Sequence, residues 1–283
     1  MTAPSVSRLS LFADDTSDAV ANLLAAARAL VPHLNRSRRI DRRLLASVMT
    51  MAFGASDAEG AWSWRDAYDA CEAALVLQVR RLGAQVAQLE DAPAEICALL
   101  SALYDLCPTQ TRRDDEQIAL DQFSTPPHMA ALAVLAAQVR AGDKVLEPSA
   151  GTGLLAVLAE ACGGDMTLNE LSPQRAGLLD GLFAAAPRSR HDAVELKDRL
   201  AGAGGFEVVL CNPPFGPLEA HLHAALNTFA DGGRLVAIVP LRLLAAEAKL
   251  PDLARRGAIV GRIALPARAF AGQGTSVETG LLV

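Results

Sequence analysis

Hydrophobic residues recur with two different periods along this chain of 283 residues. Up to about residue 120 they follow helical spacing, which predicts helices over residues 15–34, 41–54, 64–85 and 94–107. Thr16 or Ser17 is the predicted cap of the first helix, and Gly54 and Gly83 lie near the ends of the second and third. This part of the chain is therefore expected to be an all-α domain.

From Asp143 onward, short apolar runs alternate with helical ones. Such alternation is typical of a parallel, doubly wound α/β sheet that binds ligands at the carboxyl ends of its strands. The last two runs have no obvious helix between them, which predicts a closing antiparallel hairpin. The polar stretch "PTQTRRDDEQ" is the predicted boundary, so that the domains are residues 1–117 and 118–283. The predicted strands are 144–148, 166–170, 189–191, 206–211, 234–240, 261–266 and 277–283.

Composition and charge narrow the class of protein. The chain is 51% hydrophobic, and its net charge of −6 argues against binding to nucleic acid by bulk charge, although a local basic patch is compatible with it. Five scattered cysteines without a CxxC pair are typical of free thiols in a reducing compartment. No signal peptide and no apolar run of membrane-spanning length is present in the sequence. We therefore expect a soluble cytoplasmic protein that does not bind membranes.

A glycine-rich turn follows the strand predicted at residues 144–148. Glu147 ends that strand, and Gly151 and Gly153 lead into a helix, where glycine allows a positive φ and close approach of a ligand. The spacing is neither GxGxxG nor a phosphate loop, and the acidic residue suits a ligand with a cationic amino-acid end. Glu170 ends the next strand, where a carboxylate can bind ribose hydroxyls. These features favour S-adenosylmethionine over NAD; the alternative is a turn whose glycines are only structural.

Two further polar residues follow the third predicted strand. Asp192 is positioned to accept a hydrogen bond from an adenine amino group, although a solvated loop aspartate is an equal alternative. His191 beside it is expected to be a packing or surface residue. The five histidines are dispersed without the spacing of metal ligands, so we predict no metal site.

The segment "CNPPF" comes directly after the strand predicted at residues 206–211. Adjacent prolines end a strand and restrict the residue before them, so Asn212 is held in a narrow range of conformations. The Asn212 oxygen and the Pro213 carbonyl could hold both hydrogens of a planar amine, and Phe215 could stack on a base swung out of a duplex. A proline-rich turn without function is the alternative. Cys211 precedes Asn212 and is interpreted as a small strand-end residue rather than a nucleophile.

The order of four segments resembles that of gamma-class amino-methyltransferases: "QFSTP" (122–126), "EPSAGTG" (147–153), "NPPF" (212–215) and "AFAGQGTSVETGLLV" (269–283). Within that class the chain looks most like N6-adenine DNA methylases, including modification subunits of type I restriction systems. The resemblance implies a Rossmann-like, seven-stranded methyltransferase sheet that binds S-adenosylmethionine. It implies Asn212, Pro213, Pro214 and Phe215 as the catalytic motif, and Phe270 as a second ring beside the target base. The implied cofactor site is Phe123, Thr125, Pro126, Glu147, Ser149, Gly151, Gly153, Glu170, Asp192 and Asn212.

The helical part has a resemblance of its own. The segment "FGASDAEGAWSWRDAYDACEAA" is similar to the N-terminal part of bacterial and phage strawberry-notch-like proteins, in which a methylase-like domain precedes a helicase-like region. The chain ends at Val283, where a target-recognition domain is expected to begin. We therefore expect weak, non-specific DNA binding by this chain alone, with a helicase-like region or a separate specificity subunit as a partner.

One basic cluster stands out in the helical part. Arginine suits phosphate contact, although charged runs are usually solvated helix faces. Trp62 and Trp64 could stack on bases, but a place in the core of the helical domain is the favoured interpretation. The candidate nucleic-acid contacts are Arg36, Arg38, Arg39, Arg42 and Arg43.

The sequence therefore predicts an adenine-specific DNA methyltransferase that uses S-adenosylmethionine, as in restriction-modification systems. The same motif could serve adenine in RNA or a glutamine amide of a protein. A non-catalytic, cofactor-binding module of a larger helicase-like protein is the remaining alternative.

Overall fold

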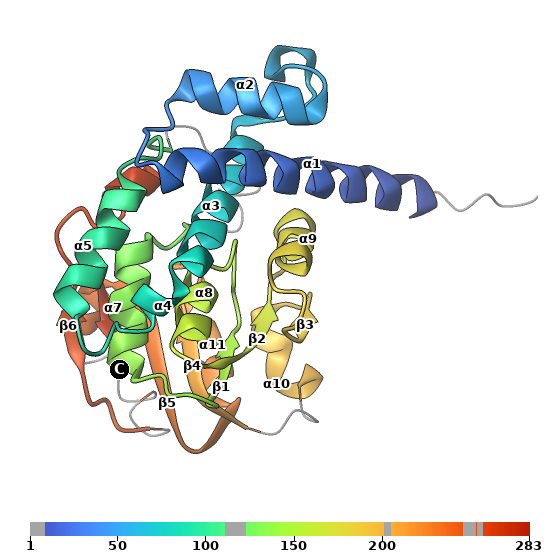
Figure 1. The fold of residues 1–283 in the computed structure, drawn as a ribbon. Coiled ribbons are helices and arrows are strands. Elements are labelled where there is room, and N and C mark those ends of the chain that lie inside the picture. The colour runs from blue at the N-terminus through green and yellow to red at the C-terminus, as the bar shows by residue number, and fades with distance from the viewer. Residues whose placement is uncertain (1–8, 111–122, 201–204, 246–252, 254–256) are drawn as a thin grey trace, which may run out of the picture.

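The computed structural model describes residues 9–110, 123–200, 205–245, 253 and 257–283 (Figure 1). Its strands form one sheet in the order β3-β2-β1-β4-β5-β7-β6. The first five of these strands are parallel, and β7 is antiparallel to both of its neighbours, β5 and β6. The doubly wound sheet and the antiparallel pair at its end are confirmed. The strands are β1 (Lys144–Glu147), β2 (Asp165–Asn169), β3 (Arg188–Ser189), β4 (Phe206–Cys211), β5 (Phe229–Pro240), β6 (Arg262–Ala264) and β7 (Thr279–Leu282).

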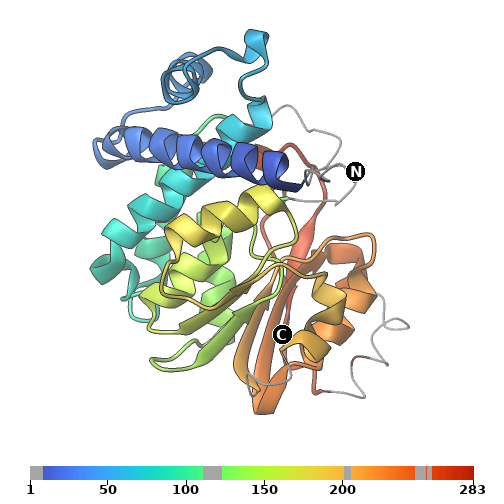
Figure 2. The ribbon, with the colours of Figure 1, turned by 90° about the vertical axis from the view of Figure 1, so that its right-hand side faces the viewer.

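Helices cover both faces of the sheet (Figure 2). One face carries α7 (Pro127–Ala137), α8 (Leu154–Ala161) and α9 (Pro173–Leu182), and the other carries α10 (Leu196–Arg199) and α11 (Leu218–Leu226). Strand β4 lies in the middle, and all of its residues except Glu207 are buried. A continuous apolar run is what a parallel strand covered on both faces requires. The short helix α12 (Leu241–Ala245) follows β5.

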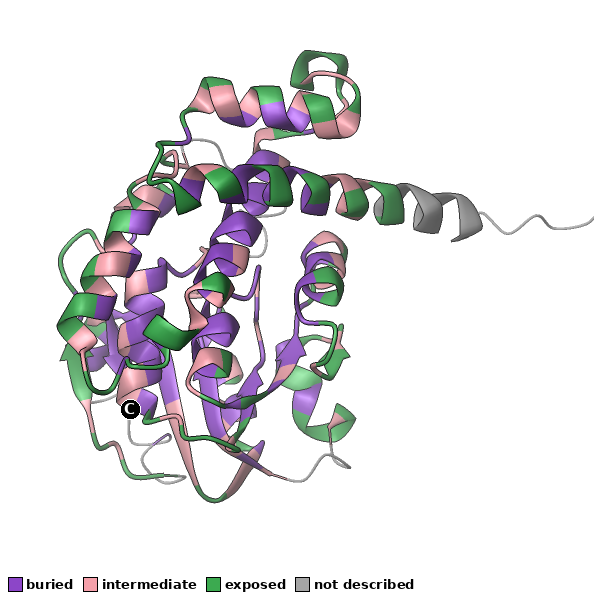
Figure 3. Cartoon of the chain, viewed as in Figure 1, coloured by how far each residue is buried: buried purple, intermediate pink, exposed green. Residues whose placement is uncertain are grey.

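The N-terminal helices form a third layer on top of α7, α8 and α9 (Figure 1). In this layer α1 packs on α9, α3 on α8, and α5 on α7. Figure 3 shows buried residues running along α3 toward the sheet, which makes α3 the centre of the layer. The helices are α1 (Leu9–Asn35), α2 (Arg42–Phe53), α3 (Trp64–Arg81), α4 (Gly83–Val86) and α5 (Pro93–Tyr104).

The ends of these helices test the predicted signals. Asp41 caps α2 by accepting a hydrogen bond from the backbone of Leu44, and Gly54 ends it in the left-handed region with φ 78°. The cap predicted at Thr16 or Ser17 was wrong, because α1 begins at Leu9 and continues through both positions. Gly83 lies at the start of the short helix α4, immediately after α3.

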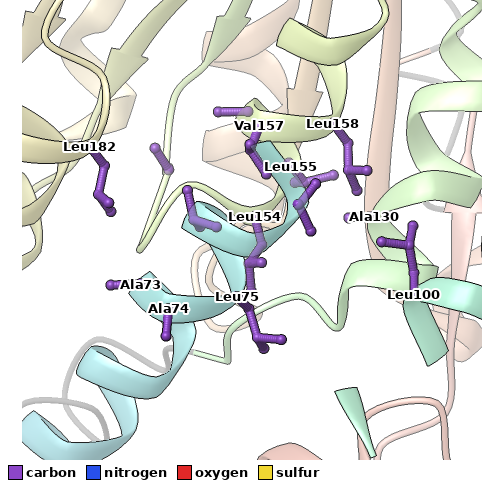
Figure 4. Close-up of a cluster of buried hydrophobic side chains, with 14 of the residues drawn as sticks. Ala73, Ala74, Leu75, Leu100, Ala130, Leu154, Leu155, Val157, Leu158 and Leu182 are labelled. Carbon is purple, nitrogen blue, oxygen red and sulfur yellow. The ribbon is translucent and has the colours of Figure 1, made fainter. Parts of the chain in front are cut away.

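Apolar side chains join the helical layer to the sheet. Ala74 and Leu75 of α3 lie beside Leu154 and Leu155 of α8 in one cluster of buried residues (Figure 4). The boundary predicted between residues 117 and 118 lies outside the described residues. Among the residues that are described, no helix combines the length and hydropathy needed to cross a membrane. All five cysteines are free thiols, as predicted.

Candidate cofactor and active site

A cavity of about 280 Å³ opens where β1, β2 and β4 end. Carboxyl ends of parallel strands are the usual place for a ligand in this type of sheet. The structure brings together in its wall most of the residues predicted from the sequence. Those that line the cavity are Phe123, Thr125, Glu147, Ser149, Gly151, Glu170, Asp192, Asn212 and Pro214. Those that do not line it are Pro126, Gly153, Pro213, Phe215 and Phe270.

Glu147 ends β1 and lines the cavity with a buried carboxyl group that is only 1% exposed. Its Oε2 atom has no hydrogen-bond partner within the described part of the chain. Burial raises the pKa of this carboxyl group well above its ordinary value. A buried acceptor without a donor costs free energy, and a cationic ligand group would supply that donor.

Glu170 follows β2 and is held by two backbone donors. Its Oε2 accepts from the Gly151 N–H at 2.7 Å, and its Oε1 accepts from the Ser172 N–H at 2.8 Å. Burial raises the pKa of Glu170, and the neighbouring Arg175 guanidinium opposes that rise. Each carboxylate oxygen can accept more than one hydrogen bond, so Glu170 is fixed in place and can still bind two hydroxyl groups.

The two glycines of the turn have different roles. Gly151 has φ 57° and lines the cavity. Gly153 has φ 90° and begins α8, but a Cβ atom at this position would lie 2.3 Å from the ring of Phe183. The structure therefore assigns Gly153 to the packing of α8 against the end of α9 rather than to the cavity wall.

Asn169 links three strand ends and was missed in the sequence. Its Nδ2 donates to the carbonyl oxygens of Pro148 and His191, each at 2.9 Å. Its Oδ1 accepts from the Ser189 hydroxyl at 2.8 Å and from the His191 N–H at 3.0 Å. The side chain of Asn169 therefore holds β1, β2 and β3 in register at the edge where the cavity opens.

Asp192 and His221 form the wall on the side of β3. Asp192 lines the cavity and also caps the short helix η2 (Ala193–Glu195) by accepting from the Val194 N–H at 3.0 Å. His221 of α11 lines the same cavity and was also missed. Burial lowers the pKa of His221, and the Asp192 carboxylate opposes this shift.

Asn212 is held by the segment that precedes α7. Its Nδ2 donates to the Phe123 carbonyl at 2.7 Å and to the Thr125 hydroxyl at 3.1 Å. Both N–H bonds of the amide are therefore used, and the remaining polar atom, Oδ1, can only accept. The half-buried ring of Phe215 lies beside Phe123, with ring centroids 6.4 Å apart. Gln122, which precedes this segment, lies outside the described residues.

Phe270 is a predicted ring that does not line the cavity. It is 2% exposed and belongs to the main cluster of buried residues. Its neighbour Gly272 lies against Tyr104 of α5, where a Cβ atom would come within 2.4 Å of the phenol oxygen. This segment is packed on the helical layer and Phe270 is buried in the core, so its role beside the target base stays a prediction from the resemblance.

A buried ion pair lies behind the cavity and joins α3 to α9. Arg175 Nη2 contacts Asp69 Oδ1 at 2.8 Å, and the two side chains are 3% and 1% exposed. Arg175 also lines the cavity. Sequence patterns could not find this pair, because its partners are separated by 106 positions.

The basic cluster is divided by the structure. Arg42 lies over the ring of Trp64, with its guanidinium carbon 4.0 Å from the ring centroid, and Trp62 is buried as favoured by the sequence. The other four arginines of the cluster (Arg36, Arg38, Arg39 and Arg43) are exposed. Within the part of the chain that the structure describes, no group of three or more potential metal ligands gathers.

The residues of the cavity fit S-adenosylmethionine. The cofactor has a cationic amino-acid end, a ribose and an adenine. Glu147 offers an unpartnered buried carboxylate oxygen, Glu170 offers a fixed carboxylate, and Asp192 offers an exposed acceptor. The donors and acceptors present in the wall therefore agree with the cofactor predicted from the sequence.

Comparisons with known proteins give distant likenesses. No protein-family model matches the chain. Ribosomal protein L11 methyltransferase from Burkholderia thailandensis is 28% identical over 122 residues, which cover 43% of this chain and 40% of that protein. The chain thus spans less than half the length of this curated relative.

Solved structures of methyltransferases superpose with similarly modest scores. A putative RNA methyltransferase from Pyrococcus horikoshii has a TM-score of 0.49 and 17% identity, over 68% of this chain and 96% of that one. A modification subunit of a putative type I restriction enzyme from Vibrio vulnificus has a TM-score of 0.48 and 17% identity, over 68% and 49% of the two chains. From its own strand order, the chain has a Rossmann-like, seven-stranded α/β fold, and the residues of its cavity fit S-adenosylmethionine.

Proposed function

We propose that the chain transfers a methyl group from S-adenosylmethionine to the N6 amine of adenine in DNA. The observation that carries this proposal is the fixed orientation of the Asn212 amide. Its two N–H bonds are used by Phe123 and Thr125, so that its oxygen is the atom left to meet a donor. A planar amine is a donor of the required kind.

The chemistry follows from the position of Asn212. When bound, the cofactor supplies an electrophilic methyl group. The Asn212 oxygen and the Pro213 carbonyl accept the two hydrogens of the target amine, which withdraws its lone pair from the ring and stabilises the positive charge that develops on nitrogen. No strong base is needed before transfer, because the neutral nitrogen attacks the methyl carbon; the sulfur–methyl bond would break to release S-adenosylhomocysteine, and the methylated nitrogen would then lose one proton to solvent. Phe215, at the end of the same turn and half-buried beside Phe123, is proposed to stack on an unpaired base.

The exposed arginines are proposed to contact DNA phosphates. Arg38 and Arg39 lie in the turn between α1 and α2, and Arg43 is in the first turn of α2. Phosphate contacts position a nucleic acid without reading its sequence, so binding by this chain is expected to be weak and sequence-tolerant. A helicase-like region or a separate specificity subunit is the proposed source of target selection.

The decisive experiment is methyl transfer with labelled S-adenosylmethionine. Single-stranded DNA, duplex DNA, RNA and a protein extract are offered in parallel, and the labelled product is digested to nucleosides or amino acids. Label in N6-methyl-2′-deoxyadenosine from the DNA supports the proposal. If label appears only in ribonucleosides or only in protein, DNA is not the substrate. Cofactor binding without any transfer supports a non-catalytic module.

A protein amine or amide is the second candidate substrate. One observation favours it: the relative matched by sequence is named for methylation of a ribosomal protein. The turn at Asn212 serves any planar amide nitrogen by the same two acceptors, so a glutamine side chain would fit its chemistry. The protein arm of the transfer experiment tests this candidate directly.

A further inference from the structure

A carboxylate from the helical layer lies buried between two parts of the cofactor cavity. Glu72 of α3 is 3% exposed and receives three hydrogen bonds. Its Oε2 accepts from the Ser124 hydroxyl at 2.6 Å and from the Thr152 hydroxyl at 2.9 Å. Its Oε1 accepts from Gln110 Nε2 at 2.6 Å. Neither the proposed chemistry nor the cofactor site described above uses Glu72.

The first of these contacts leads to the catalytic asparagine. Ser124 lies between Phe123 and Thr125, and these two residues are the acceptors that hold the Asn212 amide. Ser124 also lines the cavity. Glu72 therefore anchors, through one hydroxyl, the short segment that orients Asn212.

The second contact leads to Glu170, the carboxylate proposed to bind the ribose of the cofactor. Thr152 follows Gly151, whose N–H donates to Glu170. The side chain of Thr152 is buried, and its bond to Glu72 spans 80 positions of the sequence. Glu72 therefore also anchors the turn that fixes Glu170.

The environment of Glu72 is costly for a carboxyl group. Burial raises its pKa, while the nearby Arg175 guanidinium and the hydroxyls of Ser124 and Thr152 oppose the rise. An apolar side chain at this position would have no desolvation cost, and replacing a buried charged group by an apolar one is often neutral or stabilising. The three hydrogen bonds to separate segments are what an apolar residue could not supply.

We propose that Glu72 is a positioning residue for methyl transfer, which holds the Asn212 segment and the Glu170 turn in one geometry from the helical layer. This inference rests on the proposed methyl transfer for its effect on rate, and on cofactor binding alone for its effect on affinity. It makes α3 a part of the active enzyme and not only a cover over it.

Glu72→Leu and Glu72→Gln test the proposal in the full chain. Leucine removes all three acceptor interactions, so S-adenosylmethionine affinity should fall about 10-fold and the transfer rate at saturating cofactor about 100-fold. Glutamine keeps an oxygen for Gln110 and an amide group toward the two hydroxyls, which can rotate to accept from it. It should recover at least half of the loss on a logarithmic scale.

Arg80→Ala is the matched control on the same helix. It removes the ion pair to Glu160 of α8, the bond to the Leu182 carbonyl and the contact with the Phe183 ring, and none of these three partners lines the cavity. Affinity and rate should stay within about 2-fold of the unmodified chain, although thermal stability falls. If Arg80→Ala and Glu72→Leu reduce affinity and rate to the same extent, Glu72 acts only through stability and the proposal is overturned.

Ser124→Ala and Thr152→Val separate the two anchors and keep Glu72 in place, which guards against failure of Glu72→Leu to fold. We expect Ser124→Ala to lower the transfer rate about 10-fold and to weaken cofactor binding only about 3-fold, and Thr152→Val to weaken cofactor binding about 10-fold. Unchanged affinity in Thr152→Val together with an unchanged rate in Ser124→Ala would overturn the proposal. Absence of transfer in the unmodified chain would contradict the proposed function alone, because the affinity measurements need no methyl acceptor.

Discussion

Asn212→Asp separates the two roles that the structure gives to Asn212. The amide nitrogen donates to Phe123 and Thr125, whereas the amide oxygen is proposed to meet the substrate amine. Aspartate keeps an oxygen for the substrate but offers no donor to the segment that lines the cofactor cavity. The substitution therefore perturbs the support of the segment and leaves the proposed catalytic acceptor in place.

The magnitude follows from the two lost donors. The Phe123 carbonyl oxygen can only accept, so the 2.7 Å hydrogen bond is lost. An aspartate oxygen would face the carbonyl oxygen instead, and neither atom can donate. The Thr125 hydroxyl, at 3.1 Å, can rotate and donate to the new carboxylate. One hydrogen bond is lost and one is reversed, which costs about 1 to 2 kcal/mol. Cofactor affinity should then fall about 5- to 30-fold.

Calorimetry with S-adenosylmethionine gives the affinity, and single-turnover transfer at saturating cofactor gives the rate. Asn212→Asp should keep the rate within about 10-fold, whereas Asn212→Ala, which also lacks the oxygen, should lower it by a further factor of about 100. Equal rates in the two variants would refute the acceptor role of the oxygen. Unchanged affinity in a folded Asn212→Asp variant would refute the role of the nitrogen.

Three further predictions concern charged groups. In Glu170→Gln an amide N–H group would face one of the two backbone donors, the N–H of Gly151 or of Ser172. Cofactor binding measured by calorimetry should therefore weaken by about 1–3 kcal/mol. Full affinity in this variant would remove Glu170 from the site. Burial raises the pKa of Glu147, so between pH 4.5 and that raised pKa the folded chain holds a proton that the unfolded chain has lost. The free energy of unfolding without cofactor should therefore fall as pH rises through this range. Urea unfolding should show a flatter pH profile for Glu147→Gln, and an identical profile would contradict this assignment. The exposed arginines Arg36, Arg38, Arg39 and Arg43 are changed to Gln one at a time, and DNA binding is measured by fluorescence anisotropy at several salt concentrations. The slope of log K against log salt concentration should become shallower by about 0.7–0.9 for each arginine that contacts a phosphate, whereas Arg42→Gln should leave the slope unchanged. A larger effect of Arg42→Gln than of the other four changes would refute the proposed phosphate contacts.

The sheet could be predicted because its signals are local. Strand β4 is an apolar run ended by two prolines, and both features lie within a few residues. The start of α1 could not be predicted in the same way, because Thr16 and Ser17 are capping types that lie within a helix begun by more distant residues. A residue type that favours a cap does not require one.

The site could be predicted only where it follows a strand end. Glu147, Glu170 and Asn212 come directly after apolar runs, and the parallel sheet brings them to one edge. Glu72 gave no such signal, since it lies in the middle of α3, a helix that is buried along most of its length, and meets Thr152 only through the packing of α3 on α8. Phe270 matched a motif by order, but its ring is buried in the main core cluster, and the motif does not specify that packing.

The third layer of helices also limits which fragments of the chain can fold on their own. A fragment that begins at residue 118 would uncover the apolar side of α8 that Leu75 packs on, and it would remove Asp69, the ion-pair partner of Arg175. The two regions are therefore expected to unfold in one cooperative transition, and a fragment that contains only the sheet region is expected to aggregate when it is expressed alone.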